Sequence, residues 1–345
     1  MFDYSISSFG KFTKHSFSDE NGNAFSIVPE FGASLIELKF QGTSVLDSYD
    51  TPEALIENKW SKGIFLFPYP NRLRDGKYEH LGEQYQFDIN NKATGNSIHG
   101  FGKNVPMLVT NIQITGSNET ANRQPTSDSE VQAAFITCSW QHDGSTTAYP
   151  FPFRVDISFE MANIKGQNKS SLTVTMNFKN LADTSVPVGL GWHPYFILTP
   201  SVNETQLQMP HGSLKIDIDE RMLPTGKKEN YTDFDTLKPI SETVLDNGFY
   251  LKEDLKGNEN NKGIKETIIA DISAHNSRKL IFWQETGPGK FNFLQVFTPP
   301  HRKSIAIEPM TCNIDAFNNK DGLVLLSPNA EMEGKFGINF EMKPV

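Results

Sequence analysis

The stretch Arg154-Val-Asp-Ile-Ser-Phe-Glu-Met161 places polar and apolar side chains in strict alternation. Its apolar residues occupy every second position, which is the period of a β-strand with one buried and one wet face. The stretch Leu172-Thr-Val-Thr-Met-Asn-Phe-Lys179 repeats the pattern. Such one-sided alternation is typical of antiparallel sheets, because parallel strands buried on both faces read as continuous apolar runs. The two stretches therefore predict strands of an antiparallel sheet.

The same alternation extends to residues 84–89, 214–218 and 336–342. A helical pattern is confined to residues 52–60 and 311–317, so no crossover helices are available for parallel βαβ units. The 26 phenylalanines suit the inner faces of two packed sheets, where large side chains interdigitate across about 10 Å. The predicted fold class is therefore all-β, as a large antiparallel β-sandwich.

Turn dipeptides that favour a positive φ angle separate these strands and predict hairpins. They are Asn21-Gly22, Asp75-Gly76, Asp143-Gly144, Asn247-Gly248 and Asp321-Gly322. The polar, non-periodic residues 116–130 and 252–265 are interpreted as hairpin loops. Because neither loop has an apolar flank on which a second domain could close, residues 1–345 are predicted to form a single domain.

Composition limits the class of protein. With 37% hydrophobic and 21% charged residues, the 345-residue chain is neither collagenous nor fully disordered. Its net charge of -9 argues against a nucleic-acid partner and against an anionic membrane surface. The two cysteines, Cys138 and Cys312, are too few for a disulfide scaffold. If Met1 is the natural start, the lack of a basic and apolar leader predicts a soluble, cytoplasmic protein.

Four short segments combine polar functional groups with a restricted backbone. They are Pro68-Tyr-Pro-Asn-Arg72, Ser97-Ile-His-Gly-Phe101, Gly191-Trp-His-Pro-Tyr-Phe196 and Ile305-Ala-Ile-Glu-Pro-Met310. His193 and Glu308 each precede a proline, which biases their backbone to extended geometry and predicts strand exits. Side chains at strand exits can line a cleft.

Each candidate residue also has a purely structural interpretation. Glu308 either faces a ligand beside the small residues Ser304 and Ala306, or it is a solvated strand end. His193 either presents a nitrogen to a substrate or is a core histidine bonded to a backbone carbonyl. The same two interpretations apply to His99.

Three further residues have equally open interpretations. Asn71 and Arg72 supply planar donors for hydroxyl or carboxylate oxygens, or Arg72 braces Asp75 in the adjacent turn. Asp246 belongs to a sequence, Asp246-Asn247-Gly248, that is also a good turn by itself.

The sequence supports neither a metal nor a nucleotide. The eight histidines include no HExxH spacing and no helical pair four residues apart, so no metal is predicted. Phosphate-binding glycine motifs and the GxSxG elbow of serine hydrolases are also missing, so nucleotide binding and serine hydrolysis have no support.

Taken in order, these segments resemble the aldose 1-epimerase family, also called galactose mutarotases. The matching segments are Glu30-Phe-Gly-Ala-Ser34, Phe67-Pro-Tyr-Pro-Asn-Arg72, Asp75-Gly-Lys-Tyr78, Ile98-His-Gly100, Gly191-Trp-His-Pro-Tyr-Phe196, Leu245-Asp246, Ile307-Glu-Pro-Met-Thr311 and Asp315-Ala-Phe317. Each is weak alone, but their order along nearly the whole chain is specific. The resemblance implies a β-supersandwich that interconverts the α and β anomers of free aldoses such as galactose or glucose without a cofactor.

The resemblance also implies a role for each residue. Glu308 would be the general base and His193 the general acid. His99 would contact the region of the sugar ring oxygen, Arg72 and Asp246 would bind sugar hydroxyls, and Asn71 would order the pocket. The expected partner is a small aldose, and the expected state is a monomer or homodimer.

The chemistry of mutarotation fits an acid and base pair. A proton must leave the anomeric hydroxyl while another reaches the ring oxygen, which opens the ring to an aldehyde that rotates and recloses. Ordinary pKa values near 4.3 for Glu and 6.5 for His let a carboxylate and a partly protonated imidazole coexist. We expect anionic Glu308 to raise the pKa of His193.

Two alternatives remain within this fold. A hexose 6-phosphate mutarotase would need local cations, for which Arg72, Arg74, Lys77 and Lys103 are candidates. A non-catalytic carbohydrate-binding module would be expected to lack the acid or the base, and both residues are present. In addition, Met107 stands near a position where many family members carry tryptophan, which leaves the sugar preference open.

Overall fold

Antiparallel strands make up most of the protein, as the alternating stretches predict. The computed structural model describes residues 1–115, 131–164, 169–252, 263–273 and 276–344. The predicted loop at 116–130 and residues 253–262 of the predicted loop at 252–265 lie outside these ranges.

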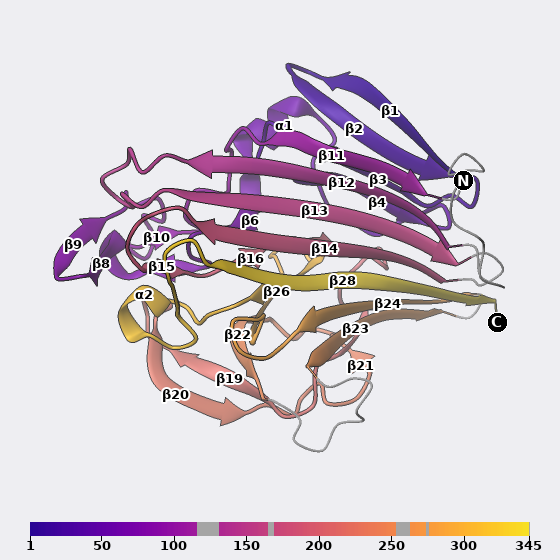
Figure 1. Ribbon diagram of the computed structural model, residues 1–345. Coiled ribbons are helices and arrows are strands. Elements are labelled where there is room, and N and C mark those ends of the chain that lie inside the picture. The colour runs from indigo at the N-terminus through magenta and orange to yellow at the C-terminus, as the bar shows by residue number, and fades with distance from the viewer. Residues whose placement is uncertain (116–130, 165–168, 253–262, 274–275, 345) are drawn as a thin grey trace.

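A sheet of long strands spans the molecule (Figure 1). In spatial order it contains β11 (Leu108–Thr115), β12 (Val131–His142), β13 (Phe153–Ile164), β14 (Lys169–Asn180), β28 (Glu331–Pro344), β24 (Asn276–Glu285), β23 (Ile264–Ser273), β18 (Gln206–Gln208) and β21 (Lys238–Pro239). Every neighbouring pair is antiparallel. The strands predicted from residues 154–161, 172–179 and 336–342 are β13, β14 and β28, which confirms the interpretation of the alternating pattern.

A second sheet of shorter strands carries the residues of interest. Its order is β20 (Pro224–Asn230), β19 (Ser213–Ile218), β22 (Asp246–Leu251), β25 (Phe293–Phe297), β26 (Ile305–Met310), β16 (Gly191–Trp192) and β6 (Phe65–Leu66), with β17 (Tyr195–Phe196) also pairing with β26. The predicted strand at 214–218 is part of β19.

The remaining strands form smaller sheets. A five-stranded sheet contains β1 (Phe2–Phe9), β2 (Phe12–Asp19), β3 (Ala24–Val28), β4 (Ser34–Phe40) and β5 (Thr43–Ser44). Two-stranded pairs are β7 (Arg72–Leu73) with β10 (Ser97–Ile98), β8 (Lys77–His80) with β9 (Glu83–Gln86), and β15 (Val186–Val188) with β27 (Val324–Leu326). The strand predicted at 84–89 is therefore shorter, because pairing with β8 ends at Gln86.

Aromatic side chains fill the space between the two larger sheets. Trp192 on β16 stacks on Phe336 of β28 with ring centroids 5.3 Å apart. Phe65 on β6 packs edge-on against Phe159 of β13 at 5.7 Å. All four rings are fully buried. The predicted all-β sandwich, with large side chains interdigitating between sheets, is confirmed.

The helical predictions were too long or displaced. The segment 52–60 forms α1 (Pro52–Glu57), which stops because Asn58 adopts a left-handed conformation with φ of 51°; a 3-10 turn (Lys59–Ser61) follows. The segment 311–317 contributes only the start of α2 (Ala316–Asn319). No helix within the described ranges is long and apolar enough to cross a membrane.

The turn predictions were right about backbone conformation more often than about hairpins. Gly22, Gly76, Gly144 and Gly322 all have positive φ angles. However, only the first and third dipeptides connect strands that pair with each other. The hairpin predicted at Asn247-Gly248 is wrong, because both residues lie within β22 and pair with β25.

Candidate active site

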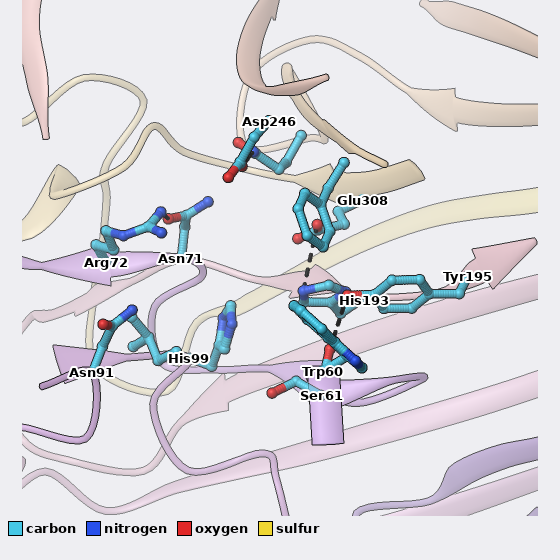
Figure 2. A pocket seen from close by; sticks show the side chains of 13 residues that line it. Trp60, Ser61, Asn71, Arg72, Asn91, His99, His193, Tyr195, Asp246 and Glu308 are labelled. Atoms are coloured by element: carbon cyan, nitrogen blue, oxygen red, sulfur yellow. Dashed lines mark hydrogen bonds and ion pairs between the residues drawn. The ribbon is translucent and has the colours of Figure 1, made fainter. Parts of the chain in front are cut away.

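The six residues singled out from the sequence line one cavity of about 270 Å³ (Figure 2). They are Asn71, Arg72, His99, His193, Asp246 and Glu308. They come from five separate parts of the chain, and the sheet topology brings them together. The lining also includes Trp60, Ser61, Asn91, Ile98, Tyr195, Gln295 and Phe297.

Strand pairing places His193 beside Glu308. Gly191 of β16 pairs with Met310 of β26, and Tyr195 of β17 pairs with Ala306. Both pairs share one antiparallel register, which sets the intervening His193 opposite Glu308. The result is a distance of 3.4 Å between His193 Nε2 and Glu308 Oε1 (Figure 2). Residues more than one hundred positions apart in sequence thus form a pair that can share a proton.

His193 is held in place through both its backbone and its ring. Its backbone nitrogen donates to the Ile64 carbonyl at 3.0 Å, and its carbonyl accepts from the Gly63 nitrogen at 2.8 Å. The Tyr195 ring stacks on the imidazole at 5.0 Å and 12°. The ring is therefore positioned before any ligand binds, as efficient proton transfer requires.

Glu308 is buried rather than a solvated strand end. Glu308 is 2% exposed, so the interpretation of this residue as a solvated strand end is wrong. On the neighbouring strand β25, Gln295 pairs with Glu308. The Nε2 atom of Gln295 donates to Asp246 Oδ1 at 2.9 Å. Gln295 thus holds the Asp246 carboxylate from the strand next to Glu308, and it was missed in the sequence. The available signal was a single amide inside the apolar run Phe293-Leu-Gln-Val-Phe297.

Arg72 faces the cavity from β7. Its Nη1 donates to Asn71 Oδ1 at 3.0 Å. The alternative that Arg72 braces Asp75 is wrong, because Asp75 pairs with Arg221 at 2.7 Å. Asn71 thus orients the guanidinium, and Arg72 presents donors toward the cavity.

His99 lies directly after β10 and contacts the second histidine. Its ring is edge-on to that of His193 with centroids 5.4 Å apart. The following Gly100 is required by a close approach, because a Cβ atom there would lie 2.2 Å from the Phe67 carbonyl oxygen. The glycine therefore allows the chain to bring His99 against the pocket.

Trp60, the last residue of the predicted helix at 52–60, and Ser61 complete the cavity. Both have left-handed backbone angles, with φ of 67° and 54°. The Trp60 carbonyl accepts a hydrogen bond from Tyr195 Oη at 3.0 Å, and its indole remains 38% exposed. Left-handed conformations of bulky residues cost energy and concentrate at functional sites. No periodic signal in the sequence identifies these two residues.

Several buried polar atoms of the pocket have no protein partner among the described residues. They are Arg72 Nε, His99 Nδ1, His193 Nδ1 and Gln295 Oε1. An unsatisfied buried polar group costs about 1 to 3 kcal/mol, so a cluster of them in one cavity indicates a place for a polar ligand.

Comparison with known proteins agrees with this architecture. The family model described as aldose 1-epimerase matches residues 15–339. The chain belongs to the aldose 1-epimerase family. The uncharacterized protein YihR of Escherichia coli K12 is 25% identical over 88% of this chain and 86% of its own length.

Solved structures share the aldose 1-epimerase fold from end to end. A galactose mutarotase-like protein from Clostridium acetobutylicum aligns with a TM-score of 0.80 and 21% identity, covering 100% of this chain and 99% of that one. Galactose 1-epimerase from Lactobacillus acidophilus aligns with a TM-score of 0.74 and 16% identity, covering 99% of each chain.

Met107, near the usual tryptophan position of the aldose 1-epimerases, is 1% exposed and belongs to the hydrophobic core. It does not line the cavity. Among the residues of the described ranges, no group of three or more His, Cys, Asp or Glu side chains is arranged to hold a metal ion.

Burial shifts the catalytic candidates toward their neutral forms. It is the main cause that lowers the pKa of His193 to about 3, and the positive charge of Arg72 contributes to the same shift. Burial, followed by the negative charge of Asp246, raises the pKa of Glu308 well above its ordinary range, while Arg72 opposes that shift. The expectation that Glu308 raises the pKa of His193 was wrong, because the desolvation of the buried imidazole outweighs any attraction.

These opposite shifts predict how the pair affects stability across pH. The raised pKa lets the folded chain hold a proton on Glu308 above pH 4.5, where the unfolded carboxyl releases it, and the lowered pKa keeps folded His193 neutral below pH 6.5, where the unfolded imidazole binds a proton. The two effects on the free energy of unfolding oppose each other between these pH values, so the slope that the pair contributes is small there. Above pH 6.5 the unfolded His193 is neutral, so the effect of Glu308 remains and stability falls as pH rises. Below pH 4.5 the unfolded Glu308 is protonated, so the effect of His193 remains and stability falls as pH falls.

Single substitutions should separate the contributions of Glu308 and His193 to the pH dependence of stability. In Glu308→Gln, the unfolded His193 binds a proton between pH 6.5 and 4.5 that the folded one does not, so stability falls with falling pH by on the order of 2 to 3 kcal/mol. In His193→Asn, the folded Glu308 keeps a proton that the unfolded one releases, so stability falls as pH rises through the same window. Urea unfolding at pH 4.5, 5.5 and 6.5 measures both slopes. Slopes of the same sign in the two variants would contradict this assignment.

Proposed function

We propose that the protein interconverts the α and β anomers of free aldoses by acid and base catalysis. The observation that carries the proposal is the 3.4 Å pairing of Glu308 with His193 in a cavity that also presents Arg72 and Asp246. An isomerase role is in line with membership of the aldose 1-epimerase family.

The pair holds the number of protons that the reaction needs. In its reactive form Glu308 is a carboxylate and His193 an imidazolium, which is the neutral pair after one proton has crossed between them. Glu308 takes the proton from the anomeric hydroxyl while His193 delivers its proton to the ring oxygen. The bond from C1 to the ring oxygen breaks, the aldehyde rotates about C1–C2, and the reverse transfers close the ring as the other anomer.

The other polar groups suit a sugar. Arg72 supplies hydrogen-bond donors to the cavity, and Asp246 supplies an acceptor. Burial raises the pKa of Asp246, whereas the charge of Arg72 and the hydrogen bond from Gln295 lower it. The positive charge of Arg72 also favours the carboxylate form of Glu308. The partly exposed Trp60 ring offers an apolar surface for the faces of a pyranose.

The cations favour a free sugar over a phosphorylated one. Of the four candidates named from the sequence, Arg72 lines the cavity, and Arg74 is paired with Asp315 at 3.5 Å. Lys77 is exposed on β8, and Lys103 lines a neighbouring cavity. A dianionic phosphate would need more than one cation close by. The non-catalytic alternative is disfavoured because acid and base stand together.

Polarimetry of freshly dissolved sugars tests the proposal. We expect the protein to accelerate the optical-rotation change of α-glucose or α-galactose more than that of glucose 6-phosphate, because the pocket offers one guanidinium to balance a phosphate. Buffer without protein gives the spontaneous rate. Acceleration confined to the phosphorylated sugar would replace this proposal with the phosphate-specific one.

A further inference from the structure

A second cavity of about 520 Å³ adjoins the first. Ser61, Ile98 and His99 line both cavities, so they form the boundary between them. Glu308, His193 and Asp246 line only the first cavity. The second cavity is nearly twice as large as the one in which we propose that a sugar ring reacts.

The second cavity combines an aromatic ring with neutral polar side chains. Trp140 of β12 lines it and is partly exposed. Its indole is fixed by edge-on packing against Phe153 at 5.6 Å and by stacking on His142 at 5.7 Å. The neutral polar lining includes Asn90, Asn104, Ser145 and Thr146. A rigid aromatic surface next to amides and hydroxyls is suited to a sugar ring, which has apolar faces and a polar edge.

The position of the second cavity indicates which carbon of the reacting sugar faces it. In the proposed reaction Glu308 acts on the anomeric oxygen and His193 on the ring oxygen. The ring of His99 contacts that of His193. In a pyranose, the atom beyond the ring oxygen from C1 is C5, which bears C6. The cavity that opens past His99 and Ser61 therefore lies on the C6 side, away from Asp246.

We propose that this cavity is a subsite for a second sugar unit, so that the protein also acts on the reducing-end ring of 1→6-linked disaccharides. The inference rests on the proposed function. The size of the cavity favours a whole ring over a small anion such as phosphate. Among the described residues that line it, Lys103 is the one Lys, Arg, Asp or Glu side chain.

The test compares glucose with melibiose, whose glucose unit carries galactose on C6. Polarimetry of both sugars gives kcat/KM for the parent protein and for Asn104→Trp, in which an indole fills the second cavity from an exposed lining position. We expect the parent to accelerate both sugars. The variant should keep kcat/KM for glucose within about twofold and lose at least about tenfold for melibiose.

Asn111→Trp provides the matched control, because Asn111 is exposed on β11 and lines neither cavity. It should leave both sugars unaffected. A second variant, Trp140→Leu, should raise KM for melibiose and leave KM for glucose unchanged, and thermal unfolding checks that its aromatic packing survives.

The remaining outcomes would overturn the inference in distinguishable ways. If the parent accelerates glucose but not melibiose, the subsite is refuted and the proposed function stands. If it accelerates neither, both are refuted. Equal losses for the two sugars in Asn104→Trp would show that the cavities do not bind separate rings. If glucose 6-phosphate is preferred and this preference is lost in Lys103→Ala, the cavity binds an anion instead.

Discussion

Glu308→Gln is expected to lower kcat for mutarotation by about 10²- to 10⁴-fold, the usual contribution of one positioned proton acceptor. The amide matches the carboxylate in shape but cannot take the proton from the anomeric hydroxyl. Because Glu308 is 2% exposed, solvent has little access to replace it as the base. Polarimetry at saturating galactose measures kcat, and calorimetric titration measures sugar binding, which we expect to change little.

Glu333→Gln is the matched control for this substitution. Glu333 lies on β28 with its side chain 48% exposed, so the same chemical change there should leave kcat unaltered. Unchanged mutarotation in Glu308→Gln would remove this carboxylate from its proposed role. Loss of binding together with turnover would make Glu308 a sugar-binding residue instead.

His193→Asn should cause a loss of similar size, about 10²- to 10⁴-fold in kcat, because the amide cannot deliver a proton to the ring oxygen. The effect should fall on kcat more than on KM, since the proton is delivered as the ring opens. Polarimetry over a range of galactose concentrations separates the two constants. Since Tyr195 stacks on the imidazole, thermal unfolding of the variant accompanies the kinetics.

His211→Asn makes the same change at a side chain that is 83% exposed and should have no effect on turnover.

The double variant Glu308→Gln with His193→Asn adds a sharper test. If the two residues work as one proton-transfer pair, the double loss should be close to the larger single loss. Losses that multiply would mean that the residues act independently, and retained activity in His193→Asn would transfer the acid role to another group such as His99.

The strands were predictable where one face of a strand is buried and the other is wet. Val155, Ile157 and Phe159 are fully buried between polar neighbours, so the alternating pattern that the chain carries locally is also the pattern that the sandwich needs. Local and tertiary preferences agree there. Such positions can be recognised without any knowledge of their partners.

Prediction failed where the two preferences conflict. Asn247-Gly248 is a strong turn dipeptide, yet the hydrogen bonds that β22 gains by pairing with β25 keep it extended. In β22 a Cβ atom at Gly248 would lie 3.3 Å from Ile216 Cδ1 and 3.4 Å from Gln295 Oε1, so the missing side chain lets these groups pack closely. A glycine that permits close packing and one that permits a turn look identical in sequence.

The sequence by itself determined the strand pattern, the antiparallel class of the sheets, and which polar residues stand beside prolines and glycines, because these follow from neighbours along the chain. Only the tertiary structure decided that Glu308 faces His193, that Gln295 and Trp60 complete the pocket, and that both ionisable groups favour their neutral forms. Register across β16, β17 and β26 sets the first of these, and removal of water by the surrounding sheets sets the last. Both arise from contacts between residues far apart in sequence, which no local pattern encodes.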